Sequence, residues 1–174
     1  DILWGLMQLQ LNIFGAVYNV TINGMEKVDQ NSAAVFAVKH SSDVDFPLAR
    51  YVFPRKAKIF ATRRIFTPAT GYFLTTAGLV PISNHSKRNR TNIPNADFSS
   101  YRQFYNLLEN GEWVVYAPES ACFPNRVGEK IFPEFMMKAS NRNVKTYVVG
   151  VSYNNRIPWL SWLLLFSPNR SVKS

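Results

Sequence analysis

The feature that most constrains the fold is a regular alternation of short apolar runs with amphipathic segments. Runs rich in β-branched and aromatic residues are typical of buried strands, and they occur at 32–39, 57–61, 79–83, 112–118 and 144–153. Segments with helical spacing and capping residues lie between them, at 45–53, 67–78, 97–111 and 132–140. Strands that alternate with helices predict a single α/β domain with a mostly parallel central sheet flanked by helices.

The segment 97–111 is the most clearly marked helix. Asp97 is a suitable N-cap and Gly111 a suitable terminator. Its apolar face is predicted to consist of Phe98, Tyr101, Phe104, Tyr105 and Leu108.

Composition supports a folded domain. The chain has 174 residues, of which 47% are hydrophobic, so it can bury a core and is not disordered. It holds one cysteine, which excludes an internal disulfide.

Both ends of the chain are strongly apolar. Residues 2–18 are apolar nearly all round, and residues 157–168 combine two tryptophans with four leucines. A membrane-spanning helix needs about 20 apolar residues, so neither stretch is expected to cross a bilayer. Each could be a core helix or lie in the membrane interface, and the presence of two such ends favours membrane contact. We therefore expect apolar terminal helices around the core.

The net charge of +9 comes from one segment. Nine basic residues and no acidic residue lie between Phe46 and Ala96, whereas the rest of the chain has eleven of each sign. Such a segment attracts polyanions such as an anionic bilayer or a phosphate-bearing ligand, although it could also be a solvated basic face. The sequence carries no RRM, KH or zinc signature, so no nucleic-acid partner is expected.

His40 ends the first predicted strand, and Asp45 follows in the first turn of the next helix. A loop between the two elements can return the carboxylate to the imidazole. A carboxylate bonded to one ring nitrogen fixes the tautomer and leaves the other nitrogen as a base. Asp45 could instead cap the helix, as could Ser42 or Asp43.

These two residues form H-x-x-x-x-D, and "KHSSDVDFPL" resembles the first motif of the glycerolipid acyltransferase superfamily. Three later stretches resemble the remaining motifs in the same order, namely "GYFLTTAGLVPISN", "VVYAPES" and "VKTYVVGVSY". The resemblance covers roughly residues 30–155. It implies 31–155 as an acyltransferase-like core between an N-terminal segment, 1–30, and a C-terminal segment, 156–174.

In that family the histidine deprotonates an acceptor hydroxyl, which attacks the thioester of acyl-CoA or acyl carrier protein. The resemblance therefore implies His40 as general base and Asp45 as the residue that orients it. No metal or bound cofactor is implied; the thioester is a co-substrate. The implied partners are a membrane lipid acceptor and an anionic membrane surface, with peripheral attachment on the cytoplasmic face.

The chain departs from the family pattern at two arginines that bind the phosphate of the acceptor. Asn84 and Cys122 stand at these positions. Either other basic residues substitute, for which Lys87, Arg88, Arg90 and Arg126 are candidates, or the acceptor lacks that phosphate. Glu119 matches the third motif and could bind acceptor hydroxyls or cap its loop. With Asn84 and Ser120 it completes the predicted substrate-binding set.

Three other functions compete with acyl transfer. A non-catalytic lipid- or acyl-CoA-binding protein on the same fold is disfavoured because both His40 and Asp45 are present. A hydrolase would use the same residues. A cysteine nucleophile at Cys122 is disfavoured because a lone cysteine is usually a buried apolar residue. His85 has no matching carboxylate and is expected to be a loop residue.

Overall fold

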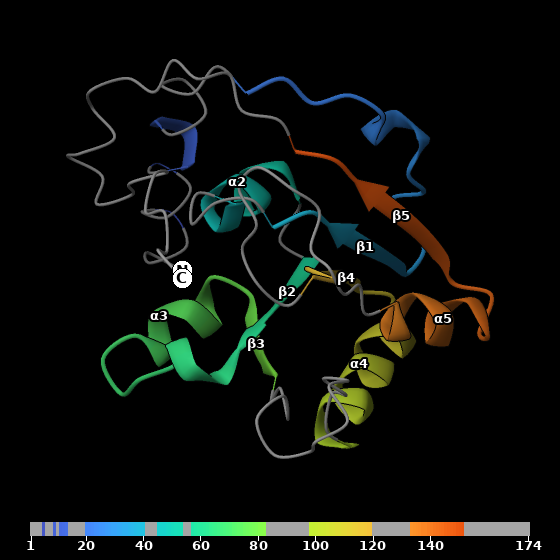
Figure 1. Cartoon of the computed structure of the whole chain (residues 1–174). Helices are drawn as coiled ribbons and strands as arrows, with labels where there is room; N and C mark the ends of the chain where they lie inside the picture. Colours follow the sequence, from blue (N-terminus) through green and yellow to red (C-terminus); the bar gives the residue numbers. More distant parts are fainter. Residues whose placement is uncertain are drawn as a thin grey trace.

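The computed structural model describes residues 5, 9, 11–13, 20–40, 45–53, 57–82, 98–119 and 133–151, with the backbone alone at 46 and 47. These residues form a three-layer α/β domain (Figure 1). Its strands are β1 (Ala34–Val38), β2 (Ala57–Thr62), β3 (Leu79–Ile82), β4 (Trp113–Tyr116) and β5 (Lys145–Val149). Its helices are α2 (Asp45–Val52), α3 (Gly71–Thr76), α4 (Phe98–Glu109) and α5 (Glu134–Ser140), with 3-10 turns η1 (Met25–Lys27) and η2 (Arg63–Ile65).

The five described strands form one sheet in the order β3-β2-β4-β1-β5, and all neighbours are parallel. The predicted parallel sheet is therefore confirmed. β3 lies at an edge of this sheet, which suits Pro81, a residue without a backbone N–H to donate to a further strand.

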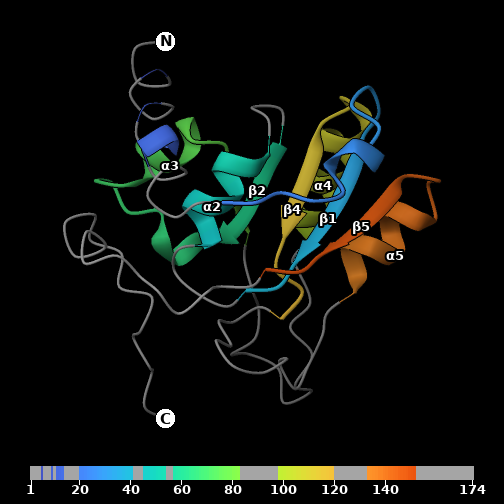
Figure 2. The ribbon, with the colours of Figure 1, turned by 90° about the horizontal axis from the view of Figure 1, so that it is seen from above.

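Helices cover both faces of the sheet (Figure 2). On one face, Ala49 of α2 and Phe53, just after α2, join a core around Phe36 and Trp113, as does Ala77 just after α3. On the other face, α4 and α5 pack Phe104 and Phe135 against the sheet. The connections β1-α2-β2 and β2-α3-β3 thus pass over one face, and those through α4 and α5 over the other. This division follows from the right-handed crossover rule, because the first two connections move towards the β3 edge and the last two move back.

Aromatic contacts fill the centre of the first face. The ring of Phe36 lies 4.8 Å from that of Phe53, 5.0 Å from that of Trp113 and 5.1 Å from that of Tyr147. The indole Nε1–H of Trp113 donates a hydrogen bond of 2.9 Å to the Ser32 carbonyl, so this large side chain is buried with its polar group paired. These contacts join the central strands β1 and β4 to α2 and to the edge strand β5.

A buried arginine anchors the carboxyl end of α2. Arg50 is 2% exposed, and its guanidinium donates to the carbonyls of Phe53 (2.7 Å), Ala57 (3.0 Å) and Ala77 (3.3 Å). Burial lowers the pKa of Arg50 to about 10, so it stays cationic at neutral pH. A cation bound to carbonyls at a helix carboxyl end also complements the helix dipole. Arg50 therefore joins α2 to the start of β2 and to the turn after α3.

Every predicted strand and helix within 30–155 is present, with boundaries shifted by a few residues. The predicted apolar face of α4 is wrong at one position. Phe104 and Leu108 are buried, and Tyr101 and Tyr105 pack against the same core, but Phe98 is 84% exposed. Phe98 is the first residue of α4, and the first buried residue of this helix is Ser100.

The two apolar ends are described only in part. Residues 5, 9 and 11–13 are helical; Leu11 is buried in the core beside α2, whereas Leu9 and Ile13 are exposed. The predicted apolar segment 157–168 lies outside the described residues, as does Asp97. Within the described part of the chain, no helix has the length and hydropathy needed to cross a membrane.

Candidate active site

The site is built where β1 ends. The backbone N–H of Lys39 donates to the Val149 carbonyl (3.2 Å), which extends the pairing of β1 with β5 by one residue beyond Val38. His40 follows immediately, so its backbone leaves the sheet from a fixed position. His40 has a side-chain exposure of 34%, which leaves the imidazole accessible to a ligand.

Asp45 is the first residue of α2 and lies against His40. Its Oδ2 is 2.8 Å from Nδ1 of the imidazole, which is hydrogen-bond distance, and its side chain is only 9% exposed. Asp45 is thus in the first turn of the helix, as predicted. The amino terminus of a helix carries partial positive charge, which favours the ionised form of a carboxylate there.

The contact determines which ring nitrogen is available. An ionised carboxylate has only acceptor atoms, so Nδ1 of a neutral His40 carries the hydrogen and donates it to Asp45. Nε2 then has a free lone pair. A neutral imidazole held in this tautomer can accept a proton at Nε2 while the buried carboxylate stabilises the imidazolium that forms.

Glu119 lies just beyond the end of the neighbouring strand, β4. Ala37 pairs with Tyr116 in the parallel β1–β4 ladder, and His40 and Glu119 each lie three residues beyond that pair. Glu119 is 7% exposed. A carboxylate predicted from the third motif therefore lies at the same carboxyl end of the sheet as the His40–Asp45 pair.

The strand order makes this carboxyl end of the sheet a natural ligand site. The connection after β1 leads to α2 on one face of the sheet, and the chain after β4 leads to α5 on the other face. Adjacent strands whose connections leave in opposite directions create a crevice at their carboxyl ends, which is where α/β proteins usually bind ligands. His40 and Glu119 occupy that position.

The structure adds one basic residue that the motifs did not indicate. Ile59 of β2 pairs with Val115 of β4, and Arg63 and Glu119 each follow that pair by four residues. Arg63 is exposed and begins η2, directly after β2. In the sequence Arg63 is one of nine basic residues of the segment, and only the strand order assigns it to the carboxyl end of the sheet, where His40 lies.

The other predicted site residues, Asn84, Lys87, Arg88, Ser120 and Arg126, lie outside the described residues, as do Arg90, Cys122 and His85. Among the described residues, no group of three or more His, Cys, Asp or Glu side chains is placed to hold a metal ion.

Comparison with known proteins gives one match. A family model described as Acyltransferase matches residues 19–154, which is most of the chain and includes all the described site residues. Neither the curated proteins nor the solved structures yield a match.

Proposed function

Because the chain belongs to the acyltransferase family, we propose that it transfers a fatty acyl group from an acyl thioester to a lipid hydroxyl, with His40 as the general base. The observation that carries this proposal is the 2.8 Å contact between Asp45 Oδ2 and His40 Nδ1, with His40 accessible at the carboxyl end of the sheet. Family membership supports acyl transfer. The donor, the acceptor and the roles of individual residues are our proposal.

In the proposed reaction, Nε2 of His40 accepts the proton of the acceptor hydroxyl as its oxygen attacks the thioester carbonyl. The tetrahedral intermediate then collapses, the carbon–sulfur bond breaks, and the thiolate of the donor leaves. The imidazolium returns its proton to the departing sulfur, so His40 and Asp45 end in their starting states. The products are an ester and a free thiol, and no acyl-enzyme forms.

Glu119 is suited to hold the acceptor. A carboxylate accepts hydrogen bonds from hydroxyl groups, and its level beside His40 would place a polyhydroxylated headgroup near the base. The family arginines that bind an acceptor phosphate are replaced by Asn84 and Cys122. We therefore propose a neutral or sugar-bearing lipid alcohol as acceptor, and peripheral attachment to the cytoplasmic face of a membrane.

The proposal is tested by incubating the purified protein with acyl-CoA, or with acyl-loaded carrier protein, and a total lipid extract. Mass spectrometry should show one lipid class gaining an acyl chain while free thiol is released in equal amount. His40→Ala should abolish the gain and keep the thermal melting profile. Thiol release without a new lipid ester would instead indicate a thioesterase that uses the same residues.

A further inference from the structure

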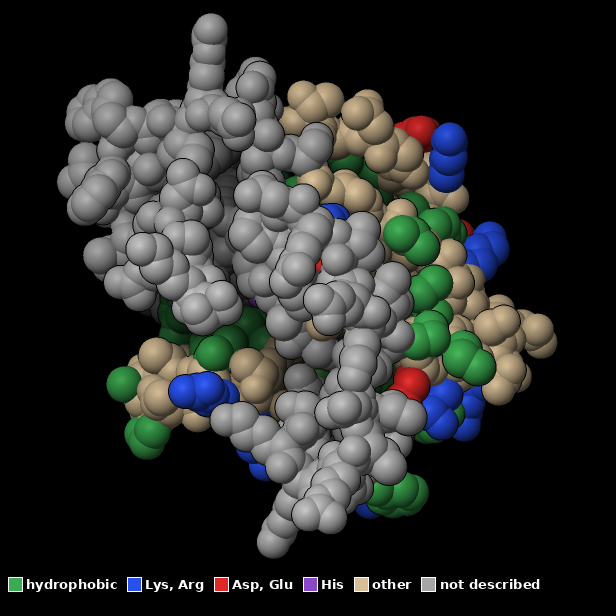
Figure 3. Space-filling view, viewed as in Figure 1, with side chains coloured by type: hydrophobic (Ala, Val, Ile, Leu, Met, Phe, Trp, Pro, Cys, Tyr) green, Lys and Arg blue, Asp and Glu red, His purple; other side chains and the backbone are tan. Residues whose placement is uncertain are grey.

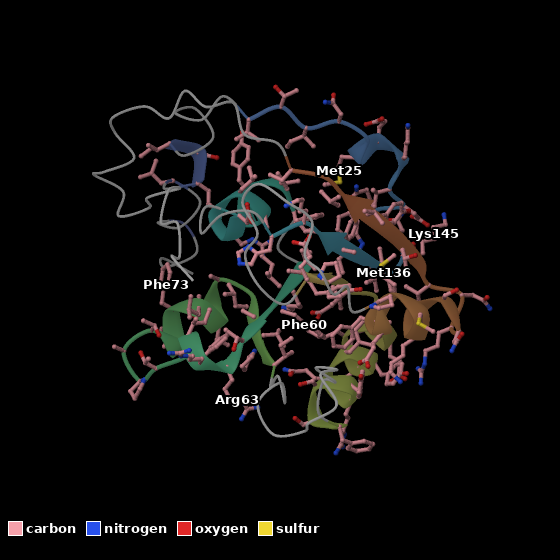
Figure 4. The ribbon with its side chains drawn as sticks, in the orientation of Figure 1. Met25, Phe60, Arg63, Phe73, Met136 and Lys145 are labelled. Carbon is pink, nitrogen blue, oxygen red and sulfur yellow. The ribbon has the colours of Figure 1, made fainter. Side chains whose placement is uncertain are left out.

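Residues 62–75, here called the η2–α3 lobe, expose an unusual set of apolar side chains. Tyr72 is 78% exposed, Ile65 42% and Phe73 41%. Most other residues of the lobe are also exposed, whereas Leu74 packs towards the core and attaches α3 to the body of the domain. In Figure 4 Phe73 extends from α3 on the side away from α4 and α5.

The lobe is held in a defined conformation by its own hydrogen bonds. The Thr70 hydroxyl donates to the Ile65 carbonyl (2.6 Å), and the backbone N–H of Thr67 donates to Thr70 Oγ1 (3.0 Å). The N–H of Gly71 donates to the Thr67 carbonyl (2.7 Å), which leads the chain into α3. The apolar side chains are therefore presented by a structured turn.

Cationic side chains accompany the apolar ones. Arg63 and Arg64 are both exposed and directly precede Ile65. No acidic residue occurs between 46 and 96, so the charge of the lobe is not balanced within its own part of the sequence. Figure 3 shows blue and green side chains together over the lobe at the lower left, and among the described residues in this view the red ones lie elsewhere.

The lobe begins at the carboxyl end of the sheet, where the candidate site lies. η2 directly follows β2, and Arg63 lies four residues beyond the Ile59–Val115 pair, as Glu119 does. A surface bound by η2 would therefore lie next to the carboxyl ends of β2 and β4, where the proposed acceptor must enter.

We propose that the η2–α3 lobe docks the protein on an anionic lipid bilayer. Ile65, Tyr72 and Phe73 would enter the boundary between headgroups and acyl chains, where aromatic side chains are favoured. Arg63 and Arg64 would remain at the level of the lipid phosphates, because a guanidinium on a long apolar stem can reach them from the rim. The lobe thereby sets that the carboxyl end of the sheet faces the membrane.

An acidic acyl carrier protein would also be attracted by the two arginines. Three large apolar side chains on a lobe of 14 residues favour a bilayer, because a strongly acidic partner would be matched by charge rather than by exposed aromatic surface. The bilayer is accordingly the occupant that we propose, and the carrier protein is an outcome of the test.

Co-sedimentation of the full chain with vesicles tests the proposal without relying on activity. Wild-type protein should bind vesicles of phosphatidylcholine with phosphatidylglycerol and bind phosphatidylcholine alone more weakly. The double variant Arg63→Gln/Arg64→Gln should weaken binding to the anionic vesicles by about thirtyfold, at about fivefold for each basic residue near the surface. Tyr72→Ser should weaken binding to both kinds of vesicle.

Matched controls use residues on other elements. Arg102→Gln/Lys145→Gln removes two exposed charges from α4 and β5, and Phe98→Ser removes a side chain that is more exposed than Tyr72. Both controls should bind like the wild type. Equal loss in the lobe and control variants would overturn the proposal, because binding would then depend only on total charge or hydrophobicity.

The docking surface rests on the proposed function only as the reason why the protein would bind a bilayer. The experiments distinguish a failure of the docking surface from a failure of the proposed function. Vesicle binding that depends on the lobe in a protein without acyl transfer would retain the docking surface and reject the function. Acyl transfer with vesicle binding unaffected by the lobe variants would retain the function and reject the surface. Loss of activity only with a carrier-protein donor, and not of vesicle binding, would assign the lobe to that protein and also reject the bilayer.

Discussion

The contact between Asp45 and His40 shows how one side chain can set the chemistry of another. The carboxylate lies 2.8 Å from Nδ1, so the hydrogen of a neutral imidazole is held there and Nε2 is free. The proposed reaction needs this tautomer, because the acceptor proton must be taken by the accessible nitrogen. Asp45 is thus proposed to act through His40 and not on the substrate.

Asp45→Asn should lower the rate of acyl transfer by about 10²- to 10⁴-fold, the usual contribution of a general base. An amide can donate to Nδ1, which favours hydrogen on Nε2 and removes the base from the accessible side. Initial rates of thiol release measure the effect. Asp29→Asn alters an exposed loop carboxylate and should keep full activity. An Asp45→Asn rate within twofold of the wild type would rule out the orienting role.

The proposed acceptor preference rests on Asn84 and Cys122, which stand in the sequence where the family motifs that the chain resembles have phosphate-binding arginines. A phosphate monoester placed near neutral groups loses the bidentate guanidinium partners that offset its desolvation. Asn84→Arg/Cys122→Arg should therefore raise turnover of lysophosphatidate and lower that of neutral lipid alcohols, measured as the ratio of the two kcat/KM values. Brisk acylation of lysophosphatidate by the unmodified protein would mean that other basic residues bind the phosphate.

At the scale of elements, α2 is attached at both ends. Asp45 at its amino end contacts His40, and Arg50 binds carbonyls around its carboxyl end. Gly78 makes room for that guanidinium. It has a φ of +83°, and a Cβ there would lie 2.9 Å from Arg50 Nη1 and 3.3 Å from the Ala57 carbonyl oxygen. The turn after α3 and the position of α2 are therefore coupled through Arg50.

Gly78→Ala should lower the free energy of unfolding by about 3 kcal/mol, because left-handed strain of about 1–2 kcal/mol is joined by the displacement of Arg50. Gly111→Ala is the matched control. Gly111 also has a positive φ, of +72°, but its Cβ would meet no atom within 4 Å, so only the strain should appear. Urea unfolding measures both. Equal losses would show that the Arg50 contact contributes nothing at this turn.

At the scale of the whole molecule, the described acidic and basic side chains are distributed unevenly along the strand order. The described part of the acid-free segment, 46–53 and 57–82, comprises α2 after Asp45 together with β2, η2, α3 and β3, and so lies in the half of the domain that ends at β3. In the other half, Arg142 Nη1, just after α5, donates to Glu109 Oε1 of α4 (3.0 Å), and the Tyr101 hydroxyl of α4 donates to Glu134 of α5. The described residues of the acid-free segment therefore lie in the β3 half of the domain.

This asymmetry predicts that binding of the wild-type chain to anionic vesicles falls as salt is raised. The Debye length shrinks from about 10 Å at 0.1 M to about 3 Å at 1 M ionic strength, which screens the attraction between exposed charges. Flotation across this range should show the decrease, with residual binding from apolar side chains. Binding that does not change with salt would leave the apolar ends and the exposed aromatic residues as the sole attachment.

Local sequence determined the elements of this protein and the pairing of His40 with Asp45. Strand and helix periods are set by neighbouring residues, and a separation of five positions across one loop allows the two side chains to meet. Pairing between distant strands has no such local signature. The order β3-β2-β4-β1-β5 therefore appeared only in the tertiary structure. This order brings Glu119 and Arg63 to the carboxyl end of the sheet beside His40.

Burial likewise depended on which elements meet. Arg50 read as one more surface charge of the basic segment, yet the junction of α2, β2 and α3 surrounds it with carbonyls and buries it. Phe98 read as part of an apolar face, yet this first residue of α4 is 84% exposed. A residue's type and spacing show what it can bury, and the packing of distant elements decides whether anything is there to cover it.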